Sequence, residues 1–563
     1  MCYNSISRNE LIKKKCRRDN KMKNVPFKSA PPDYDQRILY PSNVFDLLPS
    51  DHECYVYRDI INQLATSDLE QQYSVKGQHA YHPKLILGIL IYSYSHGVFS
   101  SREIEKQCHE NLAFMYISEK NCPNFRVISD FRKDNREFFL DCFKQVVLIA
   151  REAGMVSLGH VSLDGSKFDA DTSKHKAMSY GRLKKVEGEL VKEIEELLEK
   201  ARKTDEEEDA KYGKKSGNEL SEELKIKEKR LAKIQSARES LEKREQEVNP
   251  GKKIEDKKQI SFADHDPRIM GKKGDFDYRY NGQISVDSEH QIIVGKHLSK
   301  NVNDKKEVEP ALNELKETTG EYPEKCSIDN GYFSGANLKA LSETNIDVYI
   351  ATGKGESVDS ASASDLALDE EDCNKNKAPS TGSGTGPGTT RTKTKATSTA
   401  VSVEEKGKFQ KSSFRYDMDL DSFICPGGHR LGLKIEKKDG SKIYQCEKSL
   451  CSSCSYQSRC CSSQKGEPRS IRTDEHEPLR ESMREKMSRE ESKAIYKKRK
   501  VIVEPVFGQI KNMGFRRFHV RGFEKADGEF SLVCSVHNIK KMVRGVFRGV
   551  VRLESGKLVS NYA

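Results

Sequence analysis

Residues 160–170 read HVSLDGSKFDA, and this stretch sets the fold class because the periodicity of the chain changes there. Before it, apolar residues recur at helical spacing, whereas here apolar and polar residues alternate as in a half-buried strand. Strand-like and helix-like segments then alternate: a hairpin at 281–298, a helix near 305–318, a strand at 325–329, a helix near 336–344 and a strand at 347–353. This order of segments predicts a mixed α/β sheet.

The segment before this strand, residues 41–155, predicts an all-helical domain. Its longest apolar run lies in HPKLILGILIYSYSHG, with Pro83 near the start of a helix and Gly97 at its end. Ser100 and Glu103, in the next helical segment, have the spacing of a capping box. We therefore expect several short helices in this region.

Basic residues suggest that the helical domain binds DNA. Arg126, Arg132 and Lys133 lie near a predicted turn, which suits a helix-turn-helix-like reader of DNA. The net charge of +11 and the pI near 8.7 also favour a nucleic-acid partner. A helical bundle with a charged outer face, in a basic soluble protein, explains the same pattern, and both interpretations stay open.

Four further regions differ in composition. Residues 1–40 form a basic arm that we expect to be poorly ordered. Between residues 181 and 256 apolar residues recur at three- and four-residue steps among many Glu and Lys, which predicts an inserted helical hairpin. Residues 355–412 are low in complexity and predict a disordered linker. Residues 413–465 form a cysteine-rich insert.

The sequence predicts a cytoplasmic protein with no membrane partner. Its longest apolar run, residues 85–94, is too short to cross a bilayer. The basic N-terminal residues lack the apolar core of a secretory signal. The 15 cysteines are therefore expected in a reducing compartment, as free thiols or as metal ligands.

Three acids stand out by their context. Asp164 lies in the strand described above, Asp329 ends the strand in SIDNGYF, and Glu504 lies in YKKRKVIVEPVFGQIK. From residue 496 to residue 521 the chain has eight Lys or Arg and only this one acid. Mg²⁺ is held by carboxylates together with phosphate oxygens, so three such acids in a basic protein predict a metal site that acts on nucleic acid. Each acid alone could instead be a cap or a salt-bridge partner. Weaker candidates are Asp169, Asp171 and Asp287.

Three segments resemble those that carry the catalytic acids of bacterial insertion-sequence transposases of the DDE class. LDGSKFDADTSKHKAMSYGR resembles the segment with the first aspartate, here Asp164. SIDNGYFSGANL resembles the segment with the second, here Asp329, and YKKRKVIVEPVFGQIK the segment with the glutamate, here Glu504. Within this class the chain looks like the group with a helical N-terminal domain and a tyrosine–arginine–glutamate–lysine motif. The motif's tyrosine falls on Tyr496 and its lysine on Lys511.

The arginine of this motif has two candidates in the chain. The common spacing has three residues between arginine and glutamate; Lys500 has this spacing but is a lysine, whereas Arg499 is separated from Glu504 by four residues. Both assignments stay open. The motif and the basic residues around it are expected to contact DNA: Tyr496, Arg499, Lys500, Lys511, Arg516 and Arg517.

The resemblance implies a fold and an activity. It implies a ribonuclease-H-like catalytic domain, here residues 156–354 and 490–550, in which the three acids hold Mg²⁺ or Mn²⁺. It also implies a homodimer on double-stranded DNA, with terminal inverted repeats and a target as substrates. We therefore expect a nucleoid-associated DNA transposase that cleaves DNA and transfers strands. A nuclease of the same fold without strand transfer and a catalytically inactive DNA-binding derivative are the alternatives.

The cysteine-rich insert predicts a structural zinc site. Cys451 and Cys454 form a C-x2-C pair, which is the usual knuckle of such sites, and Cys425 and Cys460 could complete four thiolates. Free thiols are the alternative.

Overall fold

The computed structural model describes residues 43–74, 79–172, 177–212, 222–271, 274–352, 408–437, 440–461 and 467–561. The predicted arm (1–40) and most of the predicted linker (355–412) lie outside the described residues. The chain divides into two compact units, residues 1–50 and 51–563. The described part of the first unit contains the short 3-10 helix η1 (Val44–Leu47). All other elements belong to the second unit.

Besides η1, the predicted helical segment forms seven α-helices among its described residues: α2 (Glu53–Asn62), α3 (Ser67–Glu70), α4 (Pro83–Ser95), α5 (Ser101–Glu110), α6 (Leu112–Ile117), α7 (Phe125–Asp134) and α8 (Arg136–Glu152). Helix α4 begins at Pro83, as predicted, and Gly97 follows its end with a positive φ of 76°. The predicted capping box is wrong. Ser100 is the N-cap of α5, but its side chain makes no capping hydrogen bond, and Glu103 accepts a bond from Gln107 instead.

A mixed sheet follows the helices, as predicted. Its strands run in the spatial order β6–β5–β1–β7–β8, and β4 pairs with the first residues of β5. Strand β1 pairs antiparallel with β5 and parallel with β7, which in turn is parallel to β8. The strands are β1 (His160–Asp169), β4 (Arg268–Met270), β5 (Asp277–Asp287), β6 (Ile293–Ser299), β7 (Lys325–Ile328) and β8 (Asp347–Ile350).

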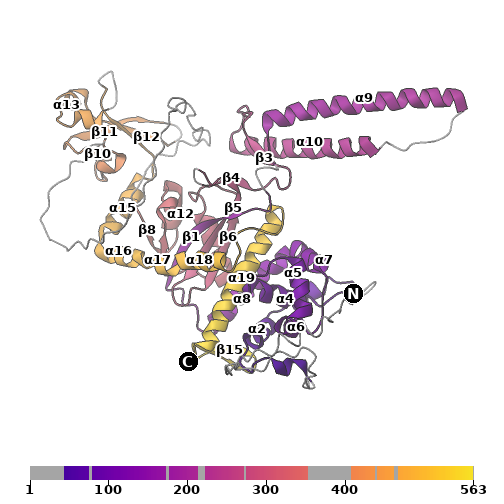
Figure 1. The fold of residues 1–563 in the computed structure, drawn as a ribbon. Helices are drawn as coiled ribbons and strands as arrows, with labels where there is room; N and C mark the ends of the chain where they lie inside the picture. The colour runs from indigo at the N-terminus through magenta and orange to yellow at the C-terminus, as the bar shows by residue number, and fades with distance from the viewer. Residues whose placement is uncertain are drawn as a thin grey trace, which may run out of the picture. The chain divides into compact units, whose positions relative to one another are not determined.

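Helices cover both faces of this sheet. On one face, α11 (Val308–Thr319) and α12 (Gly335–Ser342) bury apolar side chains against β1, β7 and β8. On the other face, the long helix α19 (Phe523–Phe547) places Phe530 against Phe168 of β1. Helix α19, yellow in Figure 1, also packs on α4 and α8, so it belongs to the core of the sheet and to that of the helical region.

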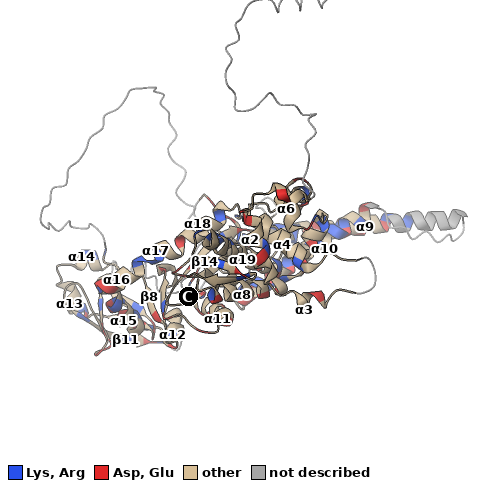
Figure 2. Cartoon of the chain, turned by 90° about the horizontal axis from the view of Figure 1, so that it is seen from below, with Lys and Arg blue, Asp and Glu red and all other residues tan. Residues whose placement is uncertain are grey.

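Two long helices occupy the range predicted as a helical hairpin: α9 (Tyr180–Tyr212) and α10 (Glu222–Val248). They pack along each other through buried residues at helical spacing, including Leu183, Leu190 and Leu241. Two short strands flank the helical pair in sequence and pair with each other antiparallel: β2 (Ala177–Ser179) before α9 and β3 (Gln259–Ser261) after α10. Figure 2 shows Lys, Arg, Asp and Glu interspersed on α9, as expected for a solvated helix.

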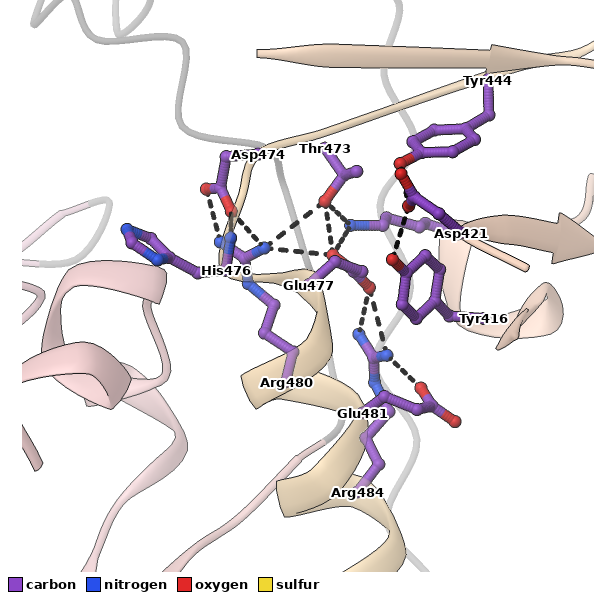
Figure 3. A network of polar contacts seen from close by, with 11 residues as sticks. Tyr416, Asp421, Tyr444, Thr473, Asp474, His476, Glu477, Arg480, Glu481 and Arg484 are labelled. Atoms are coloured by element: carbon purple, nitrogen blue, oxygen red, sulfur yellow. Dashed lines mark hydrogen bonds and ion pairs between the residues drawn. The ribbon is translucent and has the colours of Figure 1, made fainter. Parts of the chain in front are cut away.

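The cysteine-rich insert folds as a small five-stranded antiparallel sheet with its own apolar core. Buried Glu477, at the start of helix α15, accepts hydrogen bonds from Lys411, Thr473, Arg480 and Arg484, which joins this sheet to α15 (Figure 3). Helix α15 in turn packs on β8 and α12. The elements are η4 (Lys411–Ser413), β9 (Arg415–Asp417), β10 (Ser422–Ile424), β11 (Arg430–Glu436), β12 (Lys442–Gln445), α13 (Lys448–Ser452), α14 (Gln457–Cys460), β13 (Ser470–Thr473) and α15 (Glu477–Ser488).

The remaining elements complete the chain: η3 (Asn330–Tyr332), α16 (Glu490–Lys497), α17 (Arg499–Ile502), α18 (Glu504–Asn512), β14 (Val551–Glu554) and β15 (Lys557–Ser560). Among the described helices, none combines the length and the apolar character that crossing a bilayer requires.

Candidate active site

The pairing of β1 with β7 brings two of the predicted acids together. Leu163 of β1 lies opposite Ile328 of β7, so Asp164 and Asp329 are the next residues on neighbouring parallel strands, although 165 positions separate them in sequence. Gly165 permits a close approach beside Asp164, because a Cβ atom there would lie 2.5 Å from Nε2 of Gln283. The sheet register therefore builds this half of the site.

The third acid reaches the sheet from helix α18. Glu504 begins α18, and Pro505 follows it within the first turn, where its missing N–H costs nothing. Val503, Val506, Phe507 and Ile510 are buried and form an apolar stripe that docks this segment on the core.

A single guanidinium joins all three acids. Arg499 of α17 is only 6% exposed. Its Nη1 lies 3.0 Å from Oε1 of Glu504, and its Nη2 lies 3.4 Å from Oδ2 of Asp164 and 3.4 Å from Oδ1 of Asp329. The three predicted acids thus converge on one buried cation, from a strand, from the end of a second strand and from a helix.

The site perturbs the ionisation of its own groups. Burial raises the pKa of Asp164 to about 6, although Arg499 opposes this shift. Burial alone would lower the pKa of Arg499, but Asp164 and Asp329 outweigh it and raise the pKa. Burial also raises the pKa of Tyr496, whose hydroxyl lies 3.4 Å from Oδ1 of Asp329, to about 12. Arg499 therefore keeps its charge among the carboxylates.

The structure places Arg499, and not Lys500, among the acids, and the break between α17 and α18 explains the extra residue in the spacing. Proline has no N–H, so Pro505 cannot bond to the carbonyl of Val501 four residues earlier. Nε2 of Gln291 donates to that carbonyl instead, at 2.7 Å. The helix is interrupted at Val503, and Arg499 and Glu504 meet across the break.

The other predicted DNA-binding residues divide into two groups. Lys511 lies close to the acids, since its Nζ donates to Oγ of Ser166 at 2.6 Å, two residues beyond Asp164 on β1. Lys500, Arg516 and Arg517 are exposed and make no contact with the three acids.

The weaker candidate acids all have structural partners. Asp169 pairs with Arg279, and Asp171 pairs with Arg521. Asp287 is buried at the end of β5, where it accepts bonds from the backbone N–H groups of Leu158 and Glu289. Burial raises its pKa. These contacts account for the three residues without a metal.

Sequence reasoning missed Asp304, which lies in the loop after β6. Its Oδ1 accepts hydrogen bonds from Nδ2 of Asn281 at 2.7 Å and from Nε2 of Gln283 at 2.9 Å, and it pairs with Lys167 at 3.3 Å. Tyr332, three residues after Asp329, donates to Oε1 of the same Gln283. This network ties the strands that carry the acids together. A loop residue without periodicity gave no signal in the sequence.

The donor chemistry of the acids suits a hard divalent cation, since each offers carboxylate oxygens. Their oxygens surround the Arg499 guanidinium, however, and in the described part of the chain no three His, Cys, Asp or Glu lie close enough to share one metal ion. Arg499 Nε is also buried without a hydrogen-bond partner there. The carboxylates fit the ion chemically, and the arginine retains an unused donor.

The predicted zinc ligands lie around one cavity in the insert. Cys425, Cys451, Cys454 and Cys460 line a space of about 20 Å³. Burial raises the pKa of Cys451 to about 12 and that of Cys460 to about 11. The same cavity is lined by three further groups with ligating atoms: His429, Cys446 and Cys461. The sulfurs thus line one cavity as free thiols, although among the described residues no three of them lie close enough to share one metal ion.

Two family models match the chain. The model described as transposase DDE domain matches residues 424–543, which contain Arg499, Glu504 and most of the cysteine-rich insert. The model described as transposase domain (DUF772) matches residues 42–134, which contain the helices from α2 to α7. These two segments of the chain are thus similar to transposase domains, residues 424–543 to one of the DDE type. No curated protein and no solved structure matches the chain.

Proposed function

We propose that this protein binds the terminal inverted repeats of an insertion sequence, cleaves the DNA there and joins the freed ends to target DNA. The observation that carries the proposal is the meeting of Asp164, Asp329 and Glu504 at Arg499. Three carboxylates from separate parts of a basic chain, drawn to one buried point, are expected of a phosphoryl-transfer site and not of independent surface acids.

The sheet supports a ribonuclease-H-like catalytic domain. Strands β6, β5 and β1 are antiparallel neighbours, and β7 and β8 continue the sheet in parallel with β1. Asp164 lies on the first of these strands and Asp329 directly follows the fourth in chain order. The resemblance implies a first aspartate on the first strand and a second on or just after the fourth, so these positions support the proposal.

In this proposal Asp164, Asp329 and Glu504 hold Mg²⁺ or Mn²⁺, which when bound supplies charge stabilisation at the phosphate and activates the attacking oxygen. In the cut, water forms a bond to phosphorus as the bond to the 3′-oxygen breaks. In the joining step that 3′-oxygen forms a bond to a target phosphorus as the target's own 3′-oxygen leaves. The number of phosphodiester bonds is unchanged by joining.

The cationic side chains around the acids would position the DNA. The Nζ of Lys511 is suited to a phosphate oxygen beside the scissile bond, whereas Arg499, whose Nε is buried, would hold the three carboxylates in place. Tyr496 would orient Asp329 through its hydroxyl. Lys500, Arg516 and Arg517 are exposed and would contact phosphates further along the duplex.

Cleavage of DNA by acid variants tests the proposal. With the DNA that flanks the gene as substrate and Mg²⁺ present, Asp329→Ala should abolish cleavage while DNA binding is retained. Asp171→Asn, which removes an acid paired with Arg521, is the matched control and should cleave normally. Unaltered cleavage by Asp329→Ala would refute the assignment of the acids.

A strand-transfer assay separates the proposal from its nuclease alternative. Labelled DNA with a free 3′-hydroxyl end should become joined to a circular target. Cleavage without joining would favour a nuclease, and DNA binding with neither reaction would favour an inactive derivative. Size measurement of the DNA complex should give a homodimer.

We also propose that the insert binds structural Zn²⁺ through Cys425, Cys451, Cys454 and Cys460. Their shared cavity supports this, because structural zinc sites use four thiolates. Purified protein should contain one zinc, which Cys451→Ser should lose together with thermal stability. A zinc-free protein whose folding is unchanged by Cys451→Ser would contradict the proposal.

A further inference from the structure

A groove runs along helix α19, beside helix α18. It consists of three adjoining hollows of about 290, 250 and 440 Å³. The first two share Asn512, Met513 and Lys540, and the second and third share Gln509, Lys541 and Arg544. Because neighbouring hollows have walls in common, we treat them as one feature, the α19 groove.

The α19 groove is lined by cations that form no ion pair among the described residues, although the charge of Glu53 acts on Lys540. Lys540, Lys541, Arg544 and Arg548 line it from one side of the helix. None of the four forms an ion pair with any acid among the described residues; Lys540 and Lys541 donate only to the Ser95 carbonyl and to Oε1 of Gln291. Two acids line the groove as well: Glu53, which is paired with His96, and Glu289.

Gathering these cations has an electrostatic cost. Burial, followed by the charges of Arg544 and Arg548, lowers the pKa of Lys541 to about 8. The carboxyl end of a helix attracts cations, which offsets part of this repulsion. Arg544 and Arg548 nevertheless remain exposed and without ion pairs among the described residues. Such a row of cations is expected to attract an anionic partner.

The groove extends to the helix that carries Arg499 of the candidate active site. Val501 and Ile502 line its largest hollow and belong to α17, the helix that carries Arg499. Lys540 and Arg548 are eight residues apart, so the row of cations spans about 12 Å along the helix. That length corresponds to about three nucleotides of one DNA strand.

We propose that the α19 groove binds the phosphate backbone of double-stranded DNA next to the catalytic acids. This inference rests on the proposed function and adds a second contact surface to it. Duplex DNA that passes the three acids would continue along α19, where Arg544 and Arg548 contact successive phosphates. The contacts are to phosphate alone, so they are independent of base sequence.

The salt dependence of DNA binding by the full-length protein tests the groove. The probe is a fluorescein-labelled duplex of random sequence, titrated by anisotropy between about 50 and 200 mM salt. The double variant Arg544→Gln/Arg548→Gln should weaken binding about tenfold and reduce the slope of log affinity against log salt by about 1.8, since each phosphate contact contributes about 0.9. Arg544→Lys/Arg548→Lys should restore most of the slope.

A charge-matched control excludes a general effect of net charge. Lys225→Gln/Lys229→Gln removes two exposed cations from α10 and should leave the slope unchanged. An unchanged slope for Arg544→Gln/Arg548→Gln, or an equal loss of slope in the control variant, would contradict the proposal that the α19 groove binds DNA. If wild-type protein cleaves DNA while the groove variant keeps its slope, only this inference fails. If wild-type protein binds no DNA, the proposed function fails with it.

Discussion

At the scale of the residue, the candidate site depends on Arg499. A guanidinium carries its donors in a planar fork and can contact several carboxylates at once, whereas an ammonium is a point charge. Arg499 uses two nitrogens for Asp164, Asp329 and Glu504, and its third nitrogen has no partner among the described residues. Lys500, the neighbour with the expected spacing, is exposed and could not replace it.

Removal of this cation should destabilise the protein. In Arg499→Ala three carboxylates face one another without a counter-charge. Asp329 and Glu504 are each 48% exposed at their side chains, so solvent screens part of the cost, and we expect a loss of about 2 kcal/mol in the free energy of unfolding. Urea denaturation at neutral pH measures it.

The matched control is Lys500→Ala, which removes an exposed cation one residue away and should change stability by less than about 0.5 kcal/mol. Adding Asp164→Asn to Arg499→Ala should recover part of the loss, because one of the repelling charges is removed. Equal stability of Arg499→Ala and Lys500→Ala would show that the acids do not depend on this arginine.

At the scale of the element, the break between α17 and α18 aims the carboxylate of Glu504. The break has two causes that reinforce each other: Pro505 lacks a donor, and Gln291 captures the carbonyl that a continuous helix would use. One residue of a helix corresponds to about 100° of rotation. The break at Val503 therefore offsets the rotation that the additional residue of the motif would add, and Glu504 still faces Arg499.

Pro505→Ala should allow the helix to continue through the break. An alanine at this position supplies the missing N–H, which can compete with Gln291 for the Val501 carbonyl. We expect protection of the new amide in hydrogen exchange and a fall in DNA cleavage of about tenfold or more, as Glu504 rotates from the site. DNA binding should be retained. An unprotected amide with normal cleavage would show that the proline does not set the break.

The periodicity of the sequence predicted the mixed sheet and the helix bounds around Pro83 and Gly97, because these depend on local patterns. Local periodicity could not identify Arg499 as the side chain that joins the acids. Arg499 departs from the motif in spacing and Lys500 departs from it in residue type, and the choice between them depends on a helix break that involves Gln291, more than 200 residues earlier. Asp304 gave no signal, and Ser100 has the cap pattern without the bond. For Arg499 and Asp304 distant partners decide the outcome, whereas Glu103 is engaged by Gln107 of its own helix.

Glu477 should control how firmly the cysteine-rich insert is attached. It is 1% exposed and is bonded to Lys411, Arg480 and Arg484, so Glu477→Gln should cost about 3 kcal/mol by leaving buried cations uncompensated. Limited proteolysis should then release the insert faster. Glu485→Gln, an exposed acid on the same helix, is the control and should leave the rate unchanged. Equal rates for both variants would contradict this prediction.

At the scale of the whole second unit, α19 joins the helical region to the sheet through buried charges. Glu529 is fully buried and accepts from Tyr94 of α4 and from the backbone N–H of His519, with Arg132 of α7 nearby. Two residues earlier on the same helix, Asp527 pairs with Lys296 of β6 and with Arg136 of α8. Because one helix serves both cores, we expect the helical region and the sheet to unfold together.

Acid should weaken this connection through Glu529. Burial alone would raise its pKa, but the bond to His519 and the charge of Arg132 outweigh burial and lower the pKa below 4.5. A carboxyl group with a lowered folded-state pKa contributes its full stability above the unfolded pKa and loses it as the pH falls through the folded pKa. The contribution of Glu529 should therefore be complete above about pH 5 and decline below pH 4.5.

The variant Glu529→Gln separates this contribution from the rest of the protein. It leaves Arg132 buried without its carboxylate, so we expect a loss of about 3 kcal/mol at neutral pH and a smaller dependence of stability on pH below 4.5 than in the wild type. Hydrogen exchange gives the spatial readout: in the wild type, peptides of α4 and β1 should become exposed at the same denaturant concentration. In Glu529→Gln the α4 peptide should be exposed first, since α19 keeps its contacts with β6 through Asp527. If the α4 and β1 peptides still become exposed at the same denaturant concentration in the variant, apolar packing couples the two cores. The buried charges of α19 then stabilise only that helix.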